Sequence, residues 1–314
     1  MRAYALSEAG AAPAFCDVEV PEPEPGEARV RVVAASVNGF DLAVAAGYMT
    51  GFLEHFYPVV LGREFAGVVD LVADDVTSVA RGDRVFGVVS KPQLHEGAFA
   101  EYTTVVVEDC VVIVPDALAM TEAAGLAHTG STALTILEAL GDLAGKTVLV
   151  VGATGGVGTL LVQLATSAGA SVIATGRTGE GRALLTELGA AHAVDYTGGL
   201  TAPVVAIAPH GVDAAVHLNG DPDEIAPLIR PGGRFVSPVL YNPEQFDKPD
   251  LEFVPVAGYP TGAGLQRLAD LAASGALRVI VGREFAWVDI PSAFAAFGRE
   301  TLGNLVVRVG DSVA

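Results

Sequence analysis

The chain has 314 residues, 51% of them hydrophobic, which is enough for two domains with separate cores. Its formal net charge of −19 argues against nucleic acid or an anionic membrane as a partner. The N-terminal segment lacks the apolar stretch of a secretory signal, and the only two cysteines lie far apart in sequence. We therefore expect a cytoplasmic protein with reduced thiols.

Short β-rich runs fill residues 1–125, and turn-forming stretches separate them. The predicted strands cover residues 28–35, 65–71, 84–89 and 99–107. This pattern predicts a compact, mainly β domain with little helix. At residues 120–140 the pattern becomes helical, with Thr121 as the expected N-cap.

The stretch VLVVGATGGVG at residues 148–158 predicts a dinucleotide-binding turn. A short buried strand precedes the glycines, an amphipathic helix follows them, and a second strand at 171–175 completes a βαβ unit. Glycines allow close backbone approach, and the N-terminus of a helix attracts a diphosphate. The glycine spacing is G-x-x-G-x-x-G and not the commoner G-x-G-x-x-G. The prediction of dinucleotide binding therefore depends on the strand before the glycines and the helix after them. The expected contact residues are Gly152, Thr154, Gly155, Gly156, Val157 and Gly158.

Strands and helices continue to alternate after this unit. The predicted strands are 192–196, 213–218, 233–237 and 251–256, and a helix is expected at 265–273. From residue 279 the sequence pattern again resembles that of the first domain, with predicted strands at 279–281 and 305–309 around a short predicted helix at 290–297. We predict an α/β protein in which residues 1–122 and 279–314 form a mainly β domain and residues 123–278 a doubly wound parallel sheet.

Several motifs occur in a fixed order along nearly the whole chain. They are Ala35-Ser36-Val37-Asn38-x-x-Asp41, Gly62-x-Glu64-x-x-Gly67-Val68-Val69, Gly82-Asp83-Arg84-Val85, Gly97-Ala98-Phe99-Ala100-Glu101-Tyr102, Gly130-x-Thr132-Ala133, the glycine turn and Pro231-Gly232-Gly233. In these the chain resembles the medium-chain dehydrogenase/reductase superfamily, in its zinc-independent quinone oxidoreductase (zeta-crystallin-like) branch. The resemblance implies a GroES-like catalytic domain, a Rossmann-type domain inserted before its end, and a cleft between them.

The resemblance also bears on metal. Zinc-dependent relatives carry Cys where Asn38 stands, His where Arg63 stands, and a four-Cys lobe whose counterpart here, residues 90–97, holds no Cys. A structural zinc needs four ligands and a catalytic zinc about three from the protein. The six histidines show no metal-like pairing. We therefore expect no metal.

The end of the second strand of the βαβ unit indicates NADP(H). NAD-binding proteins usually place an Asp or Glu there to hold the ribose, whereas this strand ends in Thr175, Gly176 and Arg177. A small residue followed by Arg suits a 2′-phosphate, because the guanidinium offers charge and bidentate hydrogen bonds. Tyr196 matches a position at which similar quinone oxidoreductases contact the phosphate. The alternative is that Arg177 is a solvated loop charge and Tyr196 a packing residue.

Without a metal to activate an alcohol, the substrate must be electrophilic, which predicts a quinone or an α,β-unsaturated carbonyl. Asn38 is the expected hydrogen-bond donor to its carbonyl oxygen, or else a turn residue. The resemblance places Thr132 near the nicotinamide amide and Gly220 near the cofactor ribose.

Two positions depart from the family pattern. Many relatives place a Tyr two residues after Gly47, whereas here Tyr48 comes first and Met49 occupies that position. Tyr48 is therefore a candidate wall or proton donor whose register differs from the family pattern, and solvent is the other source of the proton. Asn304 replaces a Lys that is common before the last strand. Residues 39–57 and 241–249 are expected to line the substrate pocket.

The sequence leaves other functions open. The chain could bind the cofactor with little turnover, as a structural protein or redox sensor, or it could oxidise alcohols without zinc. Residues 251–256 are apolar and expected at a sheet edge, which a homodimer would cover, with Pro255 pointing away from the partner.

Overall fold

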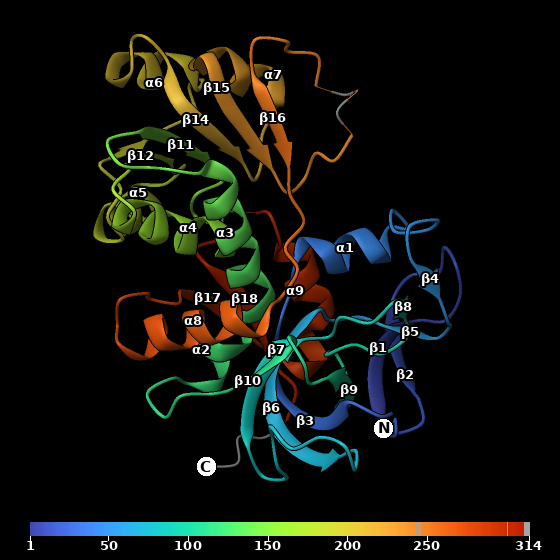
Figure 1. The fold of residues 1–314 in the computed structure, drawn as a ribbon. Helices are drawn as coiled ribbons and strands as arrows, with labels where there is room; N and C mark the ends of the chain where they lie inside the picture. Colours follow the sequence, from blue (N-terminus) through green and yellow to red (C-terminus); the bar gives the residue numbers. More distant parts are fainter. Residues whose placement is uncertain (243, 245, 300, 311–314) are drawn as a thin grey trace. The chain divides into compact units, whose positions relative to one another are not determined.

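The structure is a computed structural model that describes residues 1–310 except 243, 245 and 300. The chain forms two compact units, seen in Figure 1. Met1–His128 and Pro260–Ala314 form the first unit, and Thr129–Tyr259 forms the second unit. The domain boundaries expected from the sequence, at 122/123 and 278/279, stay a prediction.

A seven-stranded sheet organises the first unit, in the order β10-β7-β6-β3-β18-β17, and β9 also pairs with β3. The strands are β3 (Glu27–Ser36), β6 (Glu64–Val72), β7 (Arg84–Val88), β9 (Tyr102–Val106), β10 (Val111–Ile113), β17 (Val281–Ala286) and β18 (Asn304–Arg308). Near the C-terminus of the chain, β18 pairs antiparallel with β3, with Val306 opposite Ser36. Near its C-terminus the chain therefore returns to the sheet of the first unit.

Smaller elements complete the first unit. A three-stranded sheet joins β2 (Ala14–Asp17), β1 (Arg2–Leu6) and β5 (Val59–Val60), and β4 (Glu54–His55) pairs with β8 (Gln93–Leu94). The helices are α1 (Gly39–Ala45), α2 (Met120–Ala124), α8 (Gly262–Ala273) and α9 (Ile290–Ala296). The core includes Phe65, Phe99 and Leu305, all buried. Valines at alternate positions of β3, Val30 and Val32, point into this core, as a half-buried strand requires.

The helical pattern at 120–140 corresponds to two helices, α2 and α3 (Ala127–Leu140), with a break at Gly125 between them. A Cβ at Gly125 would lie 2.9 Å from Cγ of Asn304, so only glycine fits there. The expected N-cap, Thr121, is wrong. Ala119 is the N-cap of α2, and its backbone N–H donates to the Glu122 carboxylate at 2.9 Å.

The second unit contains a six-stranded sheet in the order β13-β12-β11-β14-β15-β16, with all neighbouring strands parallel. The strands are β11 (Thr147–Val151), β12 (Ser171–Thr175), β13 (His192–Val194), β14 (Val212–His217), β15 (Ile229–Ser237) and β16 (Glu252–Pro255). Strand β11 is central, and the chain proceeds from it first to one edge and then to the other. This is the doubly wound order of dinucleotide-binding domains.

Helices cover both faces of this parallel sheet. They are α4 (Gly156–Ser167), α5 (Gly179–Glu187), α6 (Thr201–Ile207) and α7 (Pro222–Ile225), the last continued by the 3-10 turn Ala226–Leu228. Figure 1 shows α4 and α5 on one face and α6 and α7 on the other. Leu160, Leu161, Leu164 and Ala165 of α4 are buried as expected, but so is every other residue from Gly158 to Ala165, so α4 is covered on more than the one predicted face. The expected fold class, a mainly β unit with a doubly wound parallel sheet, is confirmed, and β16 lies at the sheet edge as predicted.

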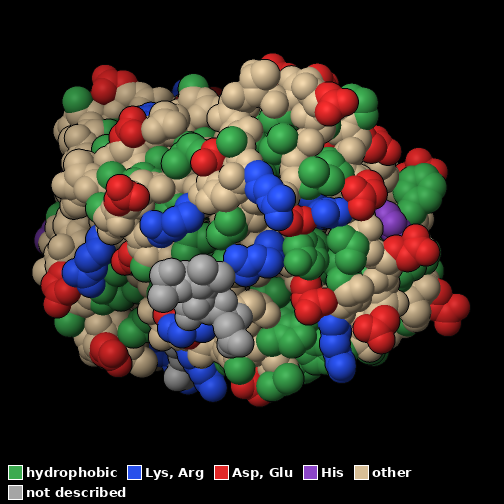
Figure 2. Space-filling view, turned by 90° about the horizontal axis from the view of Figure 1, so that it is seen from below, with side chains coloured by type: hydrophobic (Ala, Val, Ile, Leu, Met, Phe, Trp, Pro, Cys, Tyr) green, Lys and Arg blue, Asp and Glu red, His purple; other side chains and the backbone are tan. Residues whose placement is uncertain are grey.

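Acidic and basic side chains occur together on the face drawn in Figure 2. In the first unit Arg29 forms ion pairs with Glu22 and Asp70, both at 2.8 Å, and Arg308 pairs with Glu284. Several of its basic groups are thus accompanied by carboxylates. In the part of the chain that the structure describes, no helix has the length and apolarity needed to cross a membrane.

Candidate active site

The candidate cofactor residues of the second unit follow the carboxyl ends of its parallel strands. Gly152 follows β11, Gly176 follows β12, Tyr196 lies just beyond β13, and Gly220 lies just beyond β14. In open α/β sheets this edge is where ligands bind. The topology therefore collects residues that are 68 positions apart in sequence, from 152 to 220, at one edge of one sheet.

Local packing explains the unusual glycine spacing. Gly152 has φ +90°, a left-handed conformation that favours glycine, and a Cβ there would lie 3.0 Å from Cβ of Leu218. A Cβ at Gly158 would lie 2.6 Å from Cα of Ala153, so glycine lets α4 pack closely against the turn. Between them Gly155 is the N-cap of α4. Each glycine of the motif thus has its own structural role.

The first turn of α4 has the character of an anion site. Thr154, Gly155, Gly156 and Val157 are partly exposed, and no acidic residue occupies the first turn. The first N–H groups of a helix lack partners within the helix and carry a partial positive charge. A diphosphate would find backbone donors and no opposing carboxylate in this turn.

At the end of β12 the sequence predicted three cofactor-binding residues, Thr175, Gly176 and Arg177. The structure adds Arg182, which contacts two of them. The buried Thr175 Oγ1 accepts a hydrogen bond from Gly152 N at 3.1 Å, which ties this strand to the glycine turn. Arg182, on α5, donates to the carbonyl oxygens of Gly176 and Arg177 at 3.1 and 3.0 Å. A Cβ at Gly176 would lie 2.9 Å from Cγ of Arg182, so this glycine makes room for the arginine.

Arg182 also donates to Asp195 Oδ2 at 2.8 Å, just after β13. The pKa of Asp195 is lowered by hydrogen bonds from the Thr197 hydroxyl and backbone N–H, and by the charge of Arg182, so this carboxylate remains ionised. Tyr196, the next residue, is 42% exposed. The loops after β12 and β13 are therefore joined through Arg182. Sequence reasoning missed Arg182, although a second arginine soon after Arg177 was the available signal.

Thr132 and Gly220 complete the expected set in the second unit. Thr132 is buried on α3, and a Cβ at Gly258 would lie 2.2 Å from its Oγ1, so the chain at Gly258 passes directly over the hydroxyl. Gly220 has φ +93°, and its carbonyl oxygen lies 3.1 Å from Nε2 of His217. His217 was not predicted as a site residue.

In the first unit, Asn38 is the buried N-cap of α1. Its Nδ2 donates to Ser36 O and to Glu64 Oε1, both at 3.1 Å, so each amide hydrogen has an acceptor within the protein. The other oxygen of Glu64, Oε2, accepts from the backbone N–H of His128 at 2.7 Å. Glu64 is fully buried and thus joins Asn38 to the start of α3. This role of Glu64 was not predicted, although the residue belongs to a recognised motif.

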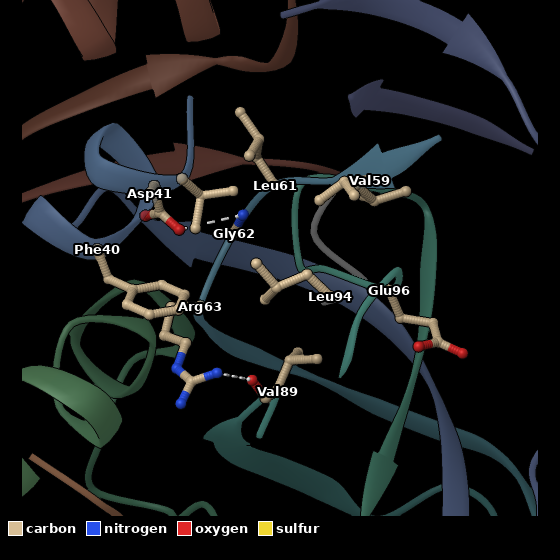
Figure 3. A pocket seen from close by; sticks show the side chains of 11 residues that line it. Phe40, Asp41, Val59, Leu61, Gly62, Arg63, Val89, Leu94 and Glu96 are labelled. Carbon is tan, nitrogen blue, oxygen red and sulfur yellow. Dashed lines mark hydrogen bonds between the residues drawn. The ribbon is translucent and has the colours of Figure 1, made fainter. Parts of the chain in front are cut away.

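Asp41 forms one wall of a small pocket beside Asn38 (Figure 3). Its carboxylate accepts from Asn38 N at 2.8 Å and from Gly62 N at 3.2 Å. Burial raises the pKa of Asp41 to about 7, and the nearby charge of Glu64 adds to this. The two backbone N–H bonds and Arg63 act in the opposite direction.

Arg63 lies in the same pocket and is also buried. It donates to Val89 O at 2.8 Å, as Figure 3 shows, and its guanidinium lies 4.4 Å from the centre of the Phe40 ring. Burial lowers the pKa of the neighbouring His128 to about 3, and the charge of Arg63 contributes. Arg63 and Asn38 occupy the two positions expected for zinc ligands in zinc-dependent relatives. Across the described residues, no cluster of three or more potential His, Cys, Asp or Glu ligands occurs.

The departures from the family pattern have structural explanations. Tyr48 is 72% exposed, whereas Met49 packs against the core of the first unit. Asn304 is buried, donates to Ile280 O at 3.2 Å and lies against Gly125. Its side chain therefore packs the interior of the first unit. Of the expected pocket segment 241–249, residues 243 and 245 lie outside the described residues.

Comparison with known proteins identifies the class. Residues 24–116 match the family described as alcohol dehydrogenase GroES-like domain, and residues 156–252 match the family described as zinc-binding dehydrogenase. The chain is 31% identical to 2-methylene-furan-3-one reductase from Solanum lycopersicum, over 98% of the chain and 79% of that relative.

Solved structures agree with this class. The quinone oxidoreductase from Coxiella burnetii superposes with a TM-score of 0.87 at 27% identity, covering 99% of both chains. A mycobacterial protein complexed with NADPH gives a TM-score of 0.85 at 26% identity, covering 98% of this chain and 99% of that chain. The chain belongs to the medium-chain dehydrogenase/reductase superfamily, among its quinone oxidoreductases and enone reductases.

Proposed function

We propose that the chain is an NADPH-dependent oxidoreductase that delivers hydride to a quinone or an α,β-unsaturated carbonyl compound without a metal. The glycine turn at the N-terminus of α4, together with Arg177 just after the end of β12, is the observation that carries the proposal, and Arg182 of α5 holds the Arg177 backbone. The turn suits the diphosphate, and Arg177 suits a 2′-phosphate, because a guanidinium group binds phosphate bidentately. The relatives support the same reading, since one is named as a reductase of an enone, another as a quinone oxidoreductase, and a third binds NADPH.

The hydride is the cofactor's own chemistry, and the protein contributes binding, orientation and a polar environment. In the second unit Thr154, Gly155, Gly156, Val157 and Gly158 would hold the diphosphate, with Thr132 and Gly220 assigned to the nicotinamide amide and the ribose. Thr175 acts indirectly in this proposal, because its hydroxyl holds Gly152 N. Arg177 and Tyr196 complete the phosphate site, and Arg182 orients the Arg177 backbone.

The proposal needs no metal because the substrate is already electrophilic. Asn38 and Arg63 stand at the two expected ligand positions, and neither an amide nor a guanidinium suits zinc, which prefers thiolate, imidazole and carboxylate ligands. Arg63 also donates to Val89 O, which occupies its guanidinium with a structural contact.

Asn38 is proposed to stabilise the negative charge that develops on the substrate carbonyl oxygen. Its Nδ2 already donates to Ser36 O and Glu64 Oε1, so donation to the substrate requires one of these bonds to be shared. This makes the expected contribution smaller than that of a dedicated donor. Solvent or the exposed Tyr48 hydroxyl would supply the proton for the product.

The test is NADPH and NADH oxidation by the purified chain against a panel of quinones, enones and alcohols, with identification of each product. We expect NADPH-dependent reduction of quinones or of conjugated C=C bonds and no NADP⁺-dependent oxidation of the alcohols. Tight NADPH binding without turnover of any acceptor would instead indicate a structural protein or redox sensor. Alcohol oxidation that survives a chelator would indicate a zinc-free alcohol dehydrogenase.

A homodimer and a cytoplasmic location are part of the proposal. Strand β16 is an edge strand with the partly exposed Phe253 and Val254, and a second copy would cover it across a two-fold axis. Light scattering at micromolar concentration should give twice the mass of one chain, and a monomer mass would refute the dimer. The cytoplasm is proposed because both cysteines, Cys16 and Cys110, are free thiols.

A further inference from the structure

His217 forms a buried bridge between two loops at the carboxyl edge of the parallel sheet. It is the last residue of β14, and its side chain lies 3.1 Å from Ser237 Oγ through Nδ1 and 3.1 Å from Gly220 O through Nε2. Ser237 is the last residue of the neighbouring strand β15. The imidazole thus joins the loop at residues 218–220 to the loop that follows β15.

The hydrogen-bond partners fix the protonation state of this imidazole. Ser237 Oγ accepts from Val239 N at 3.2 Å and from Leu240 N at 2.9 Å, which uses both of its lone pairs. Its single hydrogen has two acceptors in reach, Nδ1 of His217 at 3.1 Å and His217 O at 3.5 Å, and the shorter distance favours Nδ1. Gly220 O can only accept, so Nε2 carries the proton. His217 is therefore the neutral tautomer protonated at Nε2, and a proton added at Nδ1 would face the Ser237 hydroxyl with no lone pair to receive it.

The loop held by His217 contacts the glycine turn. Leu218 N donates to Val151 O at 3.0 Å, and a Cβ at Gly152 would lie 3.0 Å from Cβ of Leu218 and 3.2 Å from Cβ of Asn219. A shift of this loop by a few tenths of an ångström would press on the turn or open a gap beside it. The position of Gly220 is thereby linked to the geometry of the turn.

The surroundings favour the neutral form. Burial lowers the pKa of His217, whereas the hydrogen bond to Gly220 O and the charge of Asp221 act to raise it. Asp221 is the N-cap of α7, and the centre of the Phe235 ring of β15 lies 5.4 Å from the centre of the imidazole. Asp221 is the acidic group whose charge acts on the pKa of His217, and β15 contributes the Phe235 ring and the Ser237 hydroxyl.

We propose that His217 is a positioning residue for the dinucleotide: its Nε2–H holds Gly220 in place against the glycine turn, and protonation at Nδ1 in acid sets the imidazole against the Ser237 hydroxyl, shifts the bridge between the two loops and weakens cofactor binding. The inference rests on the proposed NADPH function. It adds a pH-sensitive control of cofactor affinity that depends on two loops outside the phosphate-binding turn itself.

The test compares NADPH dissociation constants of the unmutated chain with His217→Gln, His217→Phe and the control His192→Gln, at about pH 8 and about pH 5.5. Glutamine can donate and accept but does not titrate, whereas phenylalanine keeps the ring and loses both hydrogen bonds. His192 is an exposed histidine at the start of β13. It lies at the amino end of the parallel strands, whereas His217 lies at their carboxyl end. Fluorescence of bound NADPH gives the affinities, and circular dichroism checks the fold.

At about pH 8 we expect His217→Phe to bind NADPH about three- to tenfold more weakly, the effect of losing one or two hydrogen bonds. His217→Gln should bind nearly as well as the unmutated chain at this pH. In acid the unmutated chain and the His192→Gln control should lose affinity relative to His217→Gln by about threefold or more. The 2′-phosphate of NADPH also titrates near pH 6, but this titration affects every protein compared. The ratio of the NADPH dissociation constants of the unmutated chain and His217→Gln therefore reports on His217 alone.

Two results would overturn the inference: a ratio of affinities between the unmutated chain and His217→Gln that stays constant with pH, or unchanged NADPH binding by His217→Phe. The pH ratio for His217→Gln decides the question if the phenylalanine variant does not fold. Absence of NADPH binding by the unmutated chain would overturn the proposed function and this inference together. Binding by all variants alike would overturn this inference alone.

Discussion

Asn38 and Glu64 are joined side chain to side chain in the buried interior of the first unit, with Nδ2 of Asn38 3.1 Å from Oε1 of Glu64. Glu64 uses its second oxygen to accept from His128 N at 2.7 Å, at the start of α3. The orientation of the proposed substrate-contacting amide therefore depends on a carboxylate that also holds a helix. A substitution here can act on the reaction through the Asn38 amide itself or through the hydrogen bond to Glu64 that holds it.

Replacing Asn38 by Ala should slow hydride transfer by about tenfold, less than the 10²–10³ typical of a dedicated oxyanion donor. The smaller effect is expected because quinones are reactive and because both amide hydrogens already have acceptors. Affinity for NADPH should change little. The measurement is kcat beside a fluorescence titration with NADPH, and an unchanged kcat in a folded variant would make Asn38 a turn residue.

Glu64→Gln should destabilise the protein and lower kcat together. The new amide group would face a donor, either Asn38 Nδ2 or His128 N, and leaving a buried donor without an acceptor costs about 1–3 kcal/mol. Urea unfolding and kcat are measured on the same preparation, with Glu22→Gln as a control at an exposed carboxylate paired with Arg29. Equal stability of Glu64→Gln and the unmutated chain would show that the two hydrogen bonds contribute nothing.

Asp41 should make the stability fall as pH rises. Its pKa in the folded chain is about 7, above the ordinary value of 3.8, so its contribution is fully present below about pH 4 and is lost as pH rises through about 7. Asp41→Asn does not titrate and should remove that part of the slope. The measurement is the difference in unfolding free energy between the two proteins at about pH 5 and about pH 8. A difference that does not change with pH would contradict the assignment.

Arg177→Ala should remove most of the preference for NADPH over NADH, which we expect to be at least about tenfold, or about 1.4 kcal/mol. Arg230→Ala is the matched control, since Arg230 pairs with Asp213 near the start of β14, away from the carboxyl edge. Arg182→Ala should also reduce the preference, by releasing the backbone of Gly176 and Arg177. Tighter binding of NADH than of NADPH by the unmutated chain would refute the cofactor assignment.

Purified protein should contain no stoichiometric zinc, and its activity should survive chelation. Asn38 and Arg63 occupy the two expected ligand positions, and Arg63 is buried with its guanidinium over the Phe40 ring. Elemental analysis before and after dialysis against a chelator makes the measurement. About one zinc per chain, lost with activity, would overturn the expectation.

Much of the second unit could be predicted because its signals are local. The glycine turn, the strand before it and the apolar face of α4 lie within one short stretch, and the residues after β12 follow directly from it. Arg182 and His217 could not be assigned in the same way. Their roles depend on Asp195, Gly176 and Ser237, and Ser237 is 20 residues from His217 along the chain.

In the first unit the sequence identified the motifs but not the hydrogen bonds that join them. Glu64 is part of a recognised motif, yet its partners Asn38 and His128 are 26 and 64 residues away. Helix α1 was not predicted, because its seven residues are too few for a periodic signal and its start depends on the Asp41 carboxylate bound to Asn38 N. The strand expected at 279–281 is instead β17, Val281–Ala286, where exposed charged residues hide the apolar pattern.

The most direct test of the central claim is transfer of deuterium from NADPH labelled at nicotinamide C4 to an enone substrate, with the product analysed by mass spectrometry and NMR. The account predicts one deuterium at the β-carbon of the reduced product, delivered by the zinc-free chain, and a hydrogen from solvent at the α-carbon. A product without label at the β-carbon, or no reduction of any quinone or enone by a chain that binds NADPH, would contradict it.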